Sequence, residues 1–278
     1  MESPTGEHKP ELLTVLREKL ARLARWGVLA TALTGILPTE LVAQQPTPEE
    51  TKVAQRMEKL EMAKLRMQVK DRVGEAVSQV LEDPPRWTSD RVPSDPVPVS
   101  GFKNRGVVDE IRRVLADAPP SFTRQVASVS YDARVFTMPG VYGMSGNTIV
   151  ARVNRKDHRI VFSAGSYTPT PILTGEFLAH EVCHFADPMF NVDLAEPDRV
   201  RIYASVLDRM NAGDRFHSWY VEHISNPDPQ VLTTVKAGEY WAETCGAYLR
   251  DDKLLPDADR ALVESLISKT DPGYTRIR

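Results

Sequence analysis

The five-residue segment HEVCH, at positions 180–184, constrains the fold of this 278-residue chain more than any other feature. Its two histidines are four positions apart, and residues at that spacing lie one above the other on the same face of an α-helix. Neutral imidazole nitrogen is a good zinc ligand, and catalytic zinc binds three protein groups and keeps one position open. We therefore expect a helix over residues 171–185, with His180 and His184 binding one zinc ion per chain.

Glu181 follows the first histidine and is rotated around the helix from it. From that place its carboxylate reaches a zinc-bound water rather than the metal. Zinc lowers the pKa of such a water towards about 7, and a nearby carboxylate can take its proton during attack on an amide. The pattern predicts Glu181 as the catalytic base. The rest of the helix offers an apolar face of Leu173, Phe177, Ala179, Val182 and Phe185. Such a helix is half-buried, where polar groups without a metal are costly.

The third zinc ligand is expected from a helix over residues 234–250, which carries Glu239 and Glu243 four positions apart. We assign Glu239 to the metal and Glu243 to the support of a ligand histidine. The alternative is a pair of solvated glutamates on an exposed face. Asp187 comes just after the HEVCH helix, so we assign it to hydrogen bonding behind the ligands or to helix termination.

Two segments together resemble a known group of enzymes: HEVCHFAD and, farther along the chain, EYWAE. They resemble gluzincin-type zinc metallopeptidases, and within them the group of the anthrax lethal factor catalytic domain and the Pro-Pro endopeptidases. The resemblance covers about residues 105–255 and implies an endopeptidase with ligands His180, His184 and Glu239 and base Glu181. It also implies that the strand before the helix, at 159–164, lies along the cleft and pairs with an extended substrate.

The chain departs from that group at two places. The group often has glycine before the second histidine, where this chain has Cys183, so we expect looser packing of the helix on its neighbour. The group also has a tyrosine shortly before the glutamate helix, which stabilises the oxyanion, and the segment PQVLTTVKAG has none. Tyr220 and His223, with His217 as a further candidate, are expected to supply that donor from farther back.

Prolines cluster between residues 84 and 98, where they remove amide donors and force the preceding residues into extended conformations. We predict a Pro-rich linker at 84–101. It would separate a helical spacer at 44–83 from a metallopeptidase domain at 102–278.

Within that domain the patterns predict strands before helices, which is typical of an α+β fold. We expect a small antiparallel sheet, an active-site helix and a downstream glutamate-bearing helix, preceded by a helical N-terminal region. The strands are expected at 125–131, 148–153 and 159–164, the last two as a hairpin. Further helices are expected at 107–116, 196–213 and 257–268.

The N-terminus combines a basic segment at 11–25 with an apolar segment at 26–37. This order is typical of a signal peptide, here with a cleavage site after Ala43. We predict that residues 1–43 are a signal peptide or a membrane anchor, with attachment through residues 26–41. The protein would then be secreted or belong to the cell envelope. An amphipathic helix packed on the domain is the alternative.

The chain has two cysteines, Cys183 and Cys245. Two reduced core thiols are the favoured interpretation, because free cysteine is usually a small buried hydrophobe. A disulfide is the alternative, and export would favour it.

The net charge is −3 and the basic residues are spread along the chain, which argues against a nucleic-acid-binding surface. The sequence thus predicts a zinc-dependent endopeptidase acting on a peptide or protein substrate. The alternative is a catalytically weak, zinc-containing binding module attached to the envelope. A deformylase-like hydrolase is disfavoured, because it needs a cysteine ligand upstream of the helix and no cysteine precedes Cys183.

Overall fold

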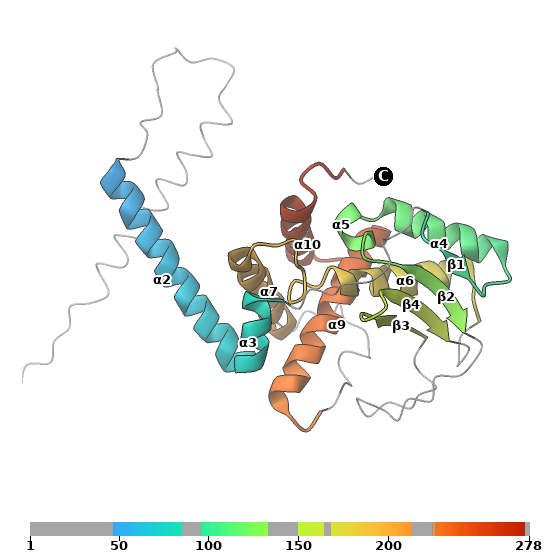
Figure 1. The fold of residues 1–278 in the computed structure, drawn as a ribbon, viewed down its shortest axis with the longest axis horizontal. Helices are drawn as coiled ribbons and strands as arrows, with labels where there is room; N and C mark the ends of the chain where they lie inside the picture. The colour runs from blue at the N-terminus through green and yellow to red at the C-terminus, as the bar shows by residue number, and fades with distance from the viewer. Residues whose placement is uncertain are drawn as a thin grey trace, which may run out of the picture. The chain divides into compact units, whose positions relative to one another are not determined.

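The computed structural model describes residues 47–84, 96–132, 150–163, 168–212, 224 and 226–275. The chain falls into two units, Met1–Gln55 and Arg56–Arg278, and only residues 47–55 of the first are described. The second unit is α+β, as predicted, and Figure 1 shows its helices and small sheet. None of the described helices combines the length and apolar character needed to cross a bilayer.

The described helices and strands follow one another in a mixed order. The helices are α2 (Pro48–Val73), α3 (Glu75–Glu82), α4 (Arg105–Asp117), α5 (Pro120–Thr123), α6 (Pro171–Phe185), α7 (Glu196–Asn211), α9 (Pro229–Arg250) and α10 (Asp257–Thr270). The strands are β1 (Val99–Ser100), β2 (Ser128–Asp132), β3 (Ala151–Asn154) and β4 (Arg159–Ser163).

The sheet has the strand order β1-β2-β4-β3. β3 and β4 are antiparallel, which confirms the predicted hairpin, but β2 runs parallel to both β1 and β4. The expected antiparallel sheet is therefore wrong, and the sheet is mixed. For β1 and β2 the reason is the crossover through α4, since a helical crossover returns the chain in a parallel direction. β1 itself lies at the end of the predicted linker.

β4 is hydrogen-bonded on both edges, to β2 through Val129–Ile160 and its neighbours and to β3 through the hairpin. A strand with two partners has no free backbone groups for a third. The expectation that this strand pairs with a substrate is therefore wrong. Among the described strands, the edge beside β4 belongs to β3.

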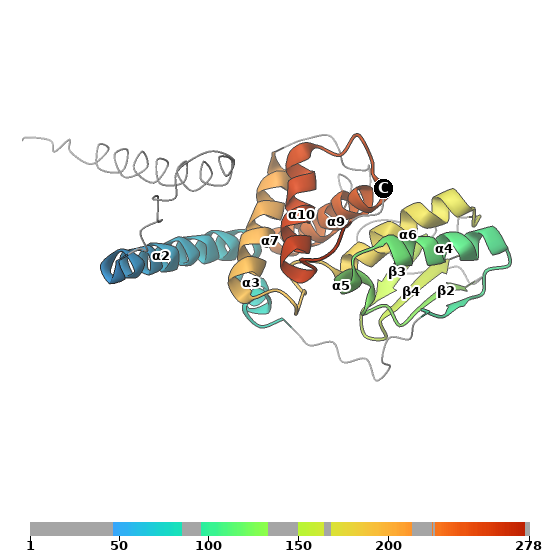
Figure 2. The same ribbon diagram turned by 90° about the horizontal axis from the view of Figure 1, so that it is seen from above.

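α4 and α6 lie side by side on one face of the sheet, and α9 packs along α6 (Figures 1 and 2). α7, α9 and α10 contact one another and extend the helical part of the core. Buried apolar side chains from the sheet and from these helices form one continuous core, with Trp241, Tyr203 and Tyr240 among its largest members. α6 is therefore packed against elements of the sheet and of the helical part of the core.

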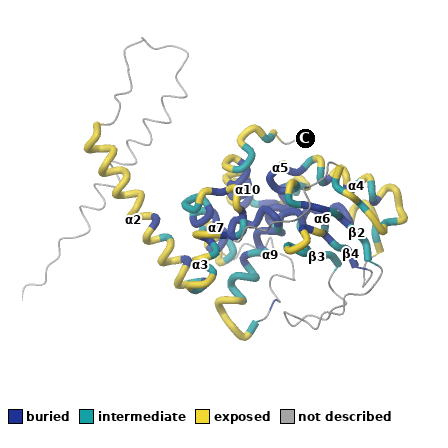
Figure 3. Tube along the Cα trace, viewed as in Figure 1, coloured by how far each residue is buried: buried dark blue, intermediate teal, exposed yellow. Residues whose placement is uncertain are grey.

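α2 and α3 are two helices rather than the one long helical stretch that the sequence suggested. Gly74 lies between them with a φ of 81°, a conformation that favours glycine. Most of α2 is exposed (Figure 3). Met62, Val69 and Val73 are buried, as is Leu81 on α3. These side chains belong to the main core cluster.

Proline and a side-chain cap mark the starts of both α6 and α9, but of these two helices the prediction gave the right bounds for α6 alone. α6 has the predicted bounds, with Pro171 in its first turn and the Thr170 side chain accepting a hydrogen bond from the Leu173 N–H. α9 begins five residues before the predicted start, at Pro229, because Asp228 caps it. The strand predicted at 125–131 begins at Ser128, because α5 and a turn precede it.

Candidate metal centre

The two histidines of HEVCH meet on one face of α6, as their spacing predicts. The His180 and His184 Nε2 atoms are 3.1 Å apart, and their rings are nearly perpendicular. Both side chains are mostly shielded from solvent, with exposed fractions of 23% and 14%. The helix alone fixes this pair, since both residues belong to the same two turns.

Glu239 reaches the pair from α9. Its Oε2 lies 3.2 Å from the His180 Nε2, and its Oε1 lies 3.7 Å from the His184 Nε2. Within the part of the chain that the structure describes, these three residues form the one group of side chains that could hold a metal ion. The predicted ligand set is therefore together in space, with its members drawn from two helices.

Glu181 is buried beside this cluster. Burial raises the pKa of its carboxyl to about 7, while the charge of a protonated His180 and a hydrogen bond from the Val153 N–H act in the opposite direction. That hydrogen bond ties the carboxylate to β3. The pKa of this carboxyl therefore lies near neutral pH, which suits a group that takes and returns a proton.

The three candidate ligand side chains perturb one another. Burial lowers the pKa of His184 to about 3, so its imidazole is neutral. Burial alone would also lower the pKa of His180, but its hydrogen bond to Glu239 and the charge of that carboxylate raise it on balance. Burial acts to raise the pKa of Glu239, yet the two histidines lower it. Glu239 is therefore an anion facing two imidazoles.

Arg155, in the turn between β3 and β4, is a residue that the sequence analysis missed. Its guanidinium donates to the backbone oxygen of His184 at 3.1 Å and to the Asp187 Oδ2 at 3.3 Å, and it lies over the Phe190 ring at 4.0 Å. It therefore fixes the end of α6 from behind the ligands. The hairpin predicted from strands at 148–153 and 159–164 placed a polar turn here, and that pattern carries no signal for this role.

Asp187 is buried just after the end of α6, where its carboxylate is hydrogen-bonded, and its assignment to hydrogen bonding behind the candidate ligands or to helix termination stays a prediction. Its Oδ1 accepts from the Met189 N–H at 3.0 Å. Burial raises the pKa of its carboxyl, although Arg155 acts to lower it. Glu243, the other predicted supporting residue, is half-buried on α9, and its charge contributes to the raised pKa of His180.

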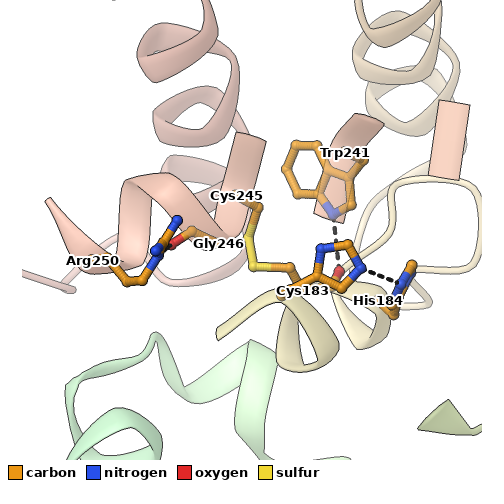
Figure 4. Close-up of a disulfide and its surroundings, with 7 residues drawn as sticks. Cys183, His184, Trp241, Cys245, Gly246 and Arg250 are labelled. Atoms are coloured by element: carbon orange, nitrogen blue, oxygen red, sulfur yellow. Dashed lines mark hydrogen bonds between the residues drawn. A yellow bond between two sulfur atoms is a disulfide. The ribbon is translucent and has the colours of Figure 1, made fainter. Parts of the chain in front are cut away.

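α6 and α9 are joined beside the ligands by a disulfide between Cys183 and Cys245 (Figure 4). The favoured expectation of two reduced thiols is wrong. Both cysteines are fully buried, and the helices bring their Cα atoms to 5.9 Å, within the range that a disulfide spans. The sequence could not decide this, because the two residues are 62 positions apart.

The same helix pair makes two further close contacts. The Trp241 indole N–H donates to the Cys183 carbonyl oxygen at 3.0 Å. A Cβ on Gly246 would lie 3.1 Å from the His180 backbone nitrogen, so glycine permits the helices to approach. The expectation of looser packing around Cys183 is therefore wrong, because α9 supplies the small residue that allows close contact.

The candidate oxyanion donors Tyr220 and His223, and also His217, lie outside the described residues. Their assignment stays a prediction. In the comparisons with known proteins, no family model, no curated protein and no solved structure matches this chain.

Proposed function

We propose that this protein is a zinc-dependent endopeptidase with one zinc ion held by His180, His184 and Glu239. The convergence of these three donors beside a buried glutamate carries the proposal. Two imidazoles and one carboxylate are a donor set typical of catalytic zinc. Ligand bonds of about 2.0–2.1 Å in a tetrahedron put donor atoms about 3.3 Å apart. The separations of 3.1, 3.2 and 3.7 Å here suit such an ion, with the last two involving different oxygens of Glu239.

Zinc in this place would supply a Lewis acid that polarises a carbonyl and makes water more acidic. The role of Glu181 follows from its surroundings. It is one residue from a ligand, buried, and held by the Val153 N–H, so its carboxylate is oriented before substrate arrives. It would accept a proton from the attacking water and return it to the leaving amine. General acid–base catalysis of this kind contributes about 10²–10⁴-fold to the rate.

β3 replaces β4 as the strand proposed to pair with substrate. In the described part of the sheet β3 has a partner on one side only, and its residue Val153 contacts Glu181. An extended peptide added to that edge would place its backbone next to the base. This supports a peptide or protein substrate rather than a small amide.

We also propose that the protein acts outside the cytoplasm, as a secreted or cell-envelope enzyme. The Cys183–Cys245 bond supports this, because structural disulfides persist mainly in oxidising compartments. The signal-like pattern in residues 1–43 supports it independently.

The test combines metal analysis with one isosteric substitution. The full-length wild-type protein should contain about one zinc per chain and hydrolyse members of a peptide library. Glu181→Gln should keep the zinc but lose at least about 100-fold in turnover, because an amide cannot accept the proton. The matched control is Glu264→Gln on α10, which removes an exposed carboxylate far along the sequence from the proposed ligands and should change neither quantity.

Each other outcome has a clear meaning. No zinc in folded wild-type protein would refute the metal site. Retained hydrolysis in Glu181→Gln would refute the role of the glutamate. Bound zinc without hydrolysis of any peptide would favour the alternative, a catalytically weak zinc-containing module attached to the envelope.

A further inference from the structure

The proposed ligands come from two helices, so the geometry of the site depends on how these helices pack against each other. The spacing of His180 and His184 is set within α6. Glu239 belongs to α9, so its distance from the histidines depends on how one helix sits on the other. A metal that prefers a tetrahedron tolerates little error in that distance.

The Cys183–Cys245 disulfide joins the two helices at the ligands themselves. Cys183 immediately precedes His184 on α6, and Cys245 lies six residues after Glu239 on α9. Figure 4 shows the bond between the two helices, with His184 and Trp241 beside it. Among the described residues, a covalent link outside the backbone occurs at this place alone.

Two non-covalent contacts next to the disulfide also hold α6 and α9 together. Trp241, two residues after Glu239, holds the Cys183 carbonyl oxygen. Gly246, next to Cys245, lies against the backbone of His180. The stretch of α9 from Glu239 to Gly246 thus contacts the HEVCH segment along its length, and the disulfide closes that contact.

We propose that the disulfide is a positioning element of the metal site, which holds Glu239 at binding distance from the two histidines. The proposal rests on the proposed metal site. It differs from general stabilisation of the fold, because it predicts that the bond acts on zinc through Glu239. Without the bond, α9 can shift relative to α6 while the core still keeps both helices folded.

A double-mutant cycle on zinc affinity separates these roles. Four full-length proteins are compared: wild type with the disulfide formed, Glu239→Ala, the pair Cys183→Ala and Cys245→Ala, and all three changes together. Zinc affinity is measured by competition with a chromophoric chelator, and circular dichroism records folding. We expect the cysteine pair to bind zinc at least about tenfold more weakly, with an unchanged spectrum. In that background Glu239→Ala should weaken binding much less than it does in wild type, because coupled residues are not additive.

Two further measurements distinguish an effect on the metal site from a general loss of stability. Leu266→Ala removes a fully buried side chain on α10, so it should lower stability without weakening zinc binding. Cobalt substituted into the cysteine-free protein should give a visible spectrum like that of Glu239→Ala. If the double variant does not fold, wild-type protein reduced with a phosphine, with both thiols confirmed by titration, takes its place.

The outcomes are distinct. Equal zinc affinity with and without the bond, or additive effects with Glu239→Ala, would overturn the proposal. Unfolding of both the cysteine-free and the reduced protein would overturn it too, since the bond would then maintain the fold rather than the ligand distance. Absence of zinc from wild type would instead refute the proposed function.

Discussion

The contact between α6 and α9 and the contact between α2 and α7 are built in different ways. α6 and α9 meet through fully buried side chains, a disulfide, an indole hydrogen bond and a glycine. α2 also has buried residues, but its described ion pairs with α7 are largely exposed. They are Arg66–Glu196, Arg72–Asp208 and Arg201–Glu58. Figure 3 shows the contrast as buried helices around α6 and a mostly exposed α2.

This difference in contacts indicates that the α6–α9 pair is more rigid than the attachment of α2. Buried close contacts resist small displacements, because the interior is packed at crystal-like density. Exposed ion pairs contribute little, about 0–1 kcal/mol each. The buried Arg199 side chain of α7 is bonded to α3 rather than to α2, since its guanidinium donates to the Leu81 and Glu82 carbonyl oxygens at the end of α3. The helices that carry the proposed ligands are thus held by buried contacts, while α2 is held mainly toward its C-terminal end.

The largest expected effect comes from Trp241→Ala. It removes a fully buried aromatic side chain and the hydrogen bond to Cys183, which should lower the free energy of unfolding by about 3–5 kcal/mol. Urea denaturation followed by circular dichroism measures it. Leu60→Ala on α2, at 71% exposure, is the control and should change stability by less than about 0.5 kcal/mol. Similar losses of unfolding free energy in both variants would show that the α6–α9 contact is no more important for stability than α2.

Gly246→Ala should have an intermediate effect. The added methyl group meets the His180 backbone, and overpacking costs about 1–3 kcal/mol, which the better helix propensity of alanine offsets by about 1 kcal/mol. We expect a net loss of about 1 kcal/mol in unfolding free energy, together with weaker zinc binding. Gly238→Ala on the same helix is the matched control, because its Cβ would lie at an ordinary 3.5 Å from the Asp187 Oδ2. Its stability should stay the same or increase.

Arg66→Ala should have the smallest effect. It breaks the two hydrogen bonds to Glu196 on α7, and the side chain of Arg66 is 43% exposed. Loss of this pair should lower stability by less than about 1 kcal/mol, with a smaller difference in high salt. Denaturation midpoints at low and high ionic strength measure both. A loss as large as that of Trp241→Ala would show that α2 is held as firmly as the ligand helices.

The sequence predicted those parts of the site that depend on local spacing. His180 and His184 are four residues apart on one helix, so their convergence follows from helix geometry alone. The β3–β4 hairpin and the bounds of α6 follow from alternation, proline and a cap. Glu239 was assigned through a helix-face argument and a resemblance, and the structure brings it to the histidines.

The remaining features depend on contacts between distant positions. Arg155 supports the end of α6 from a turn whose sequence looks like an ordinary connection. The pairing of Cys183 with Cys245 and the approach at Gly246 follow from the way two helices pack, which no local pattern encodes. The parallel pairing of β1 and β2 was missed for a similar reason, since β1 is only two residues long.

The disulfide also acts on the chain before it folds. It closes a loop between positions that are 62 residues apart, and that loop contains the whole of α7. In the chain-entropy description, closing a loop of this size lowers the conformational entropy of the unfolded ensemble, which adds about 4 kcal/mol to the free energy of unfolding. The bond that joins α6 to α9 thus also makes the unfolded state of the intervening segment less favourable, whether or not either helix has formed.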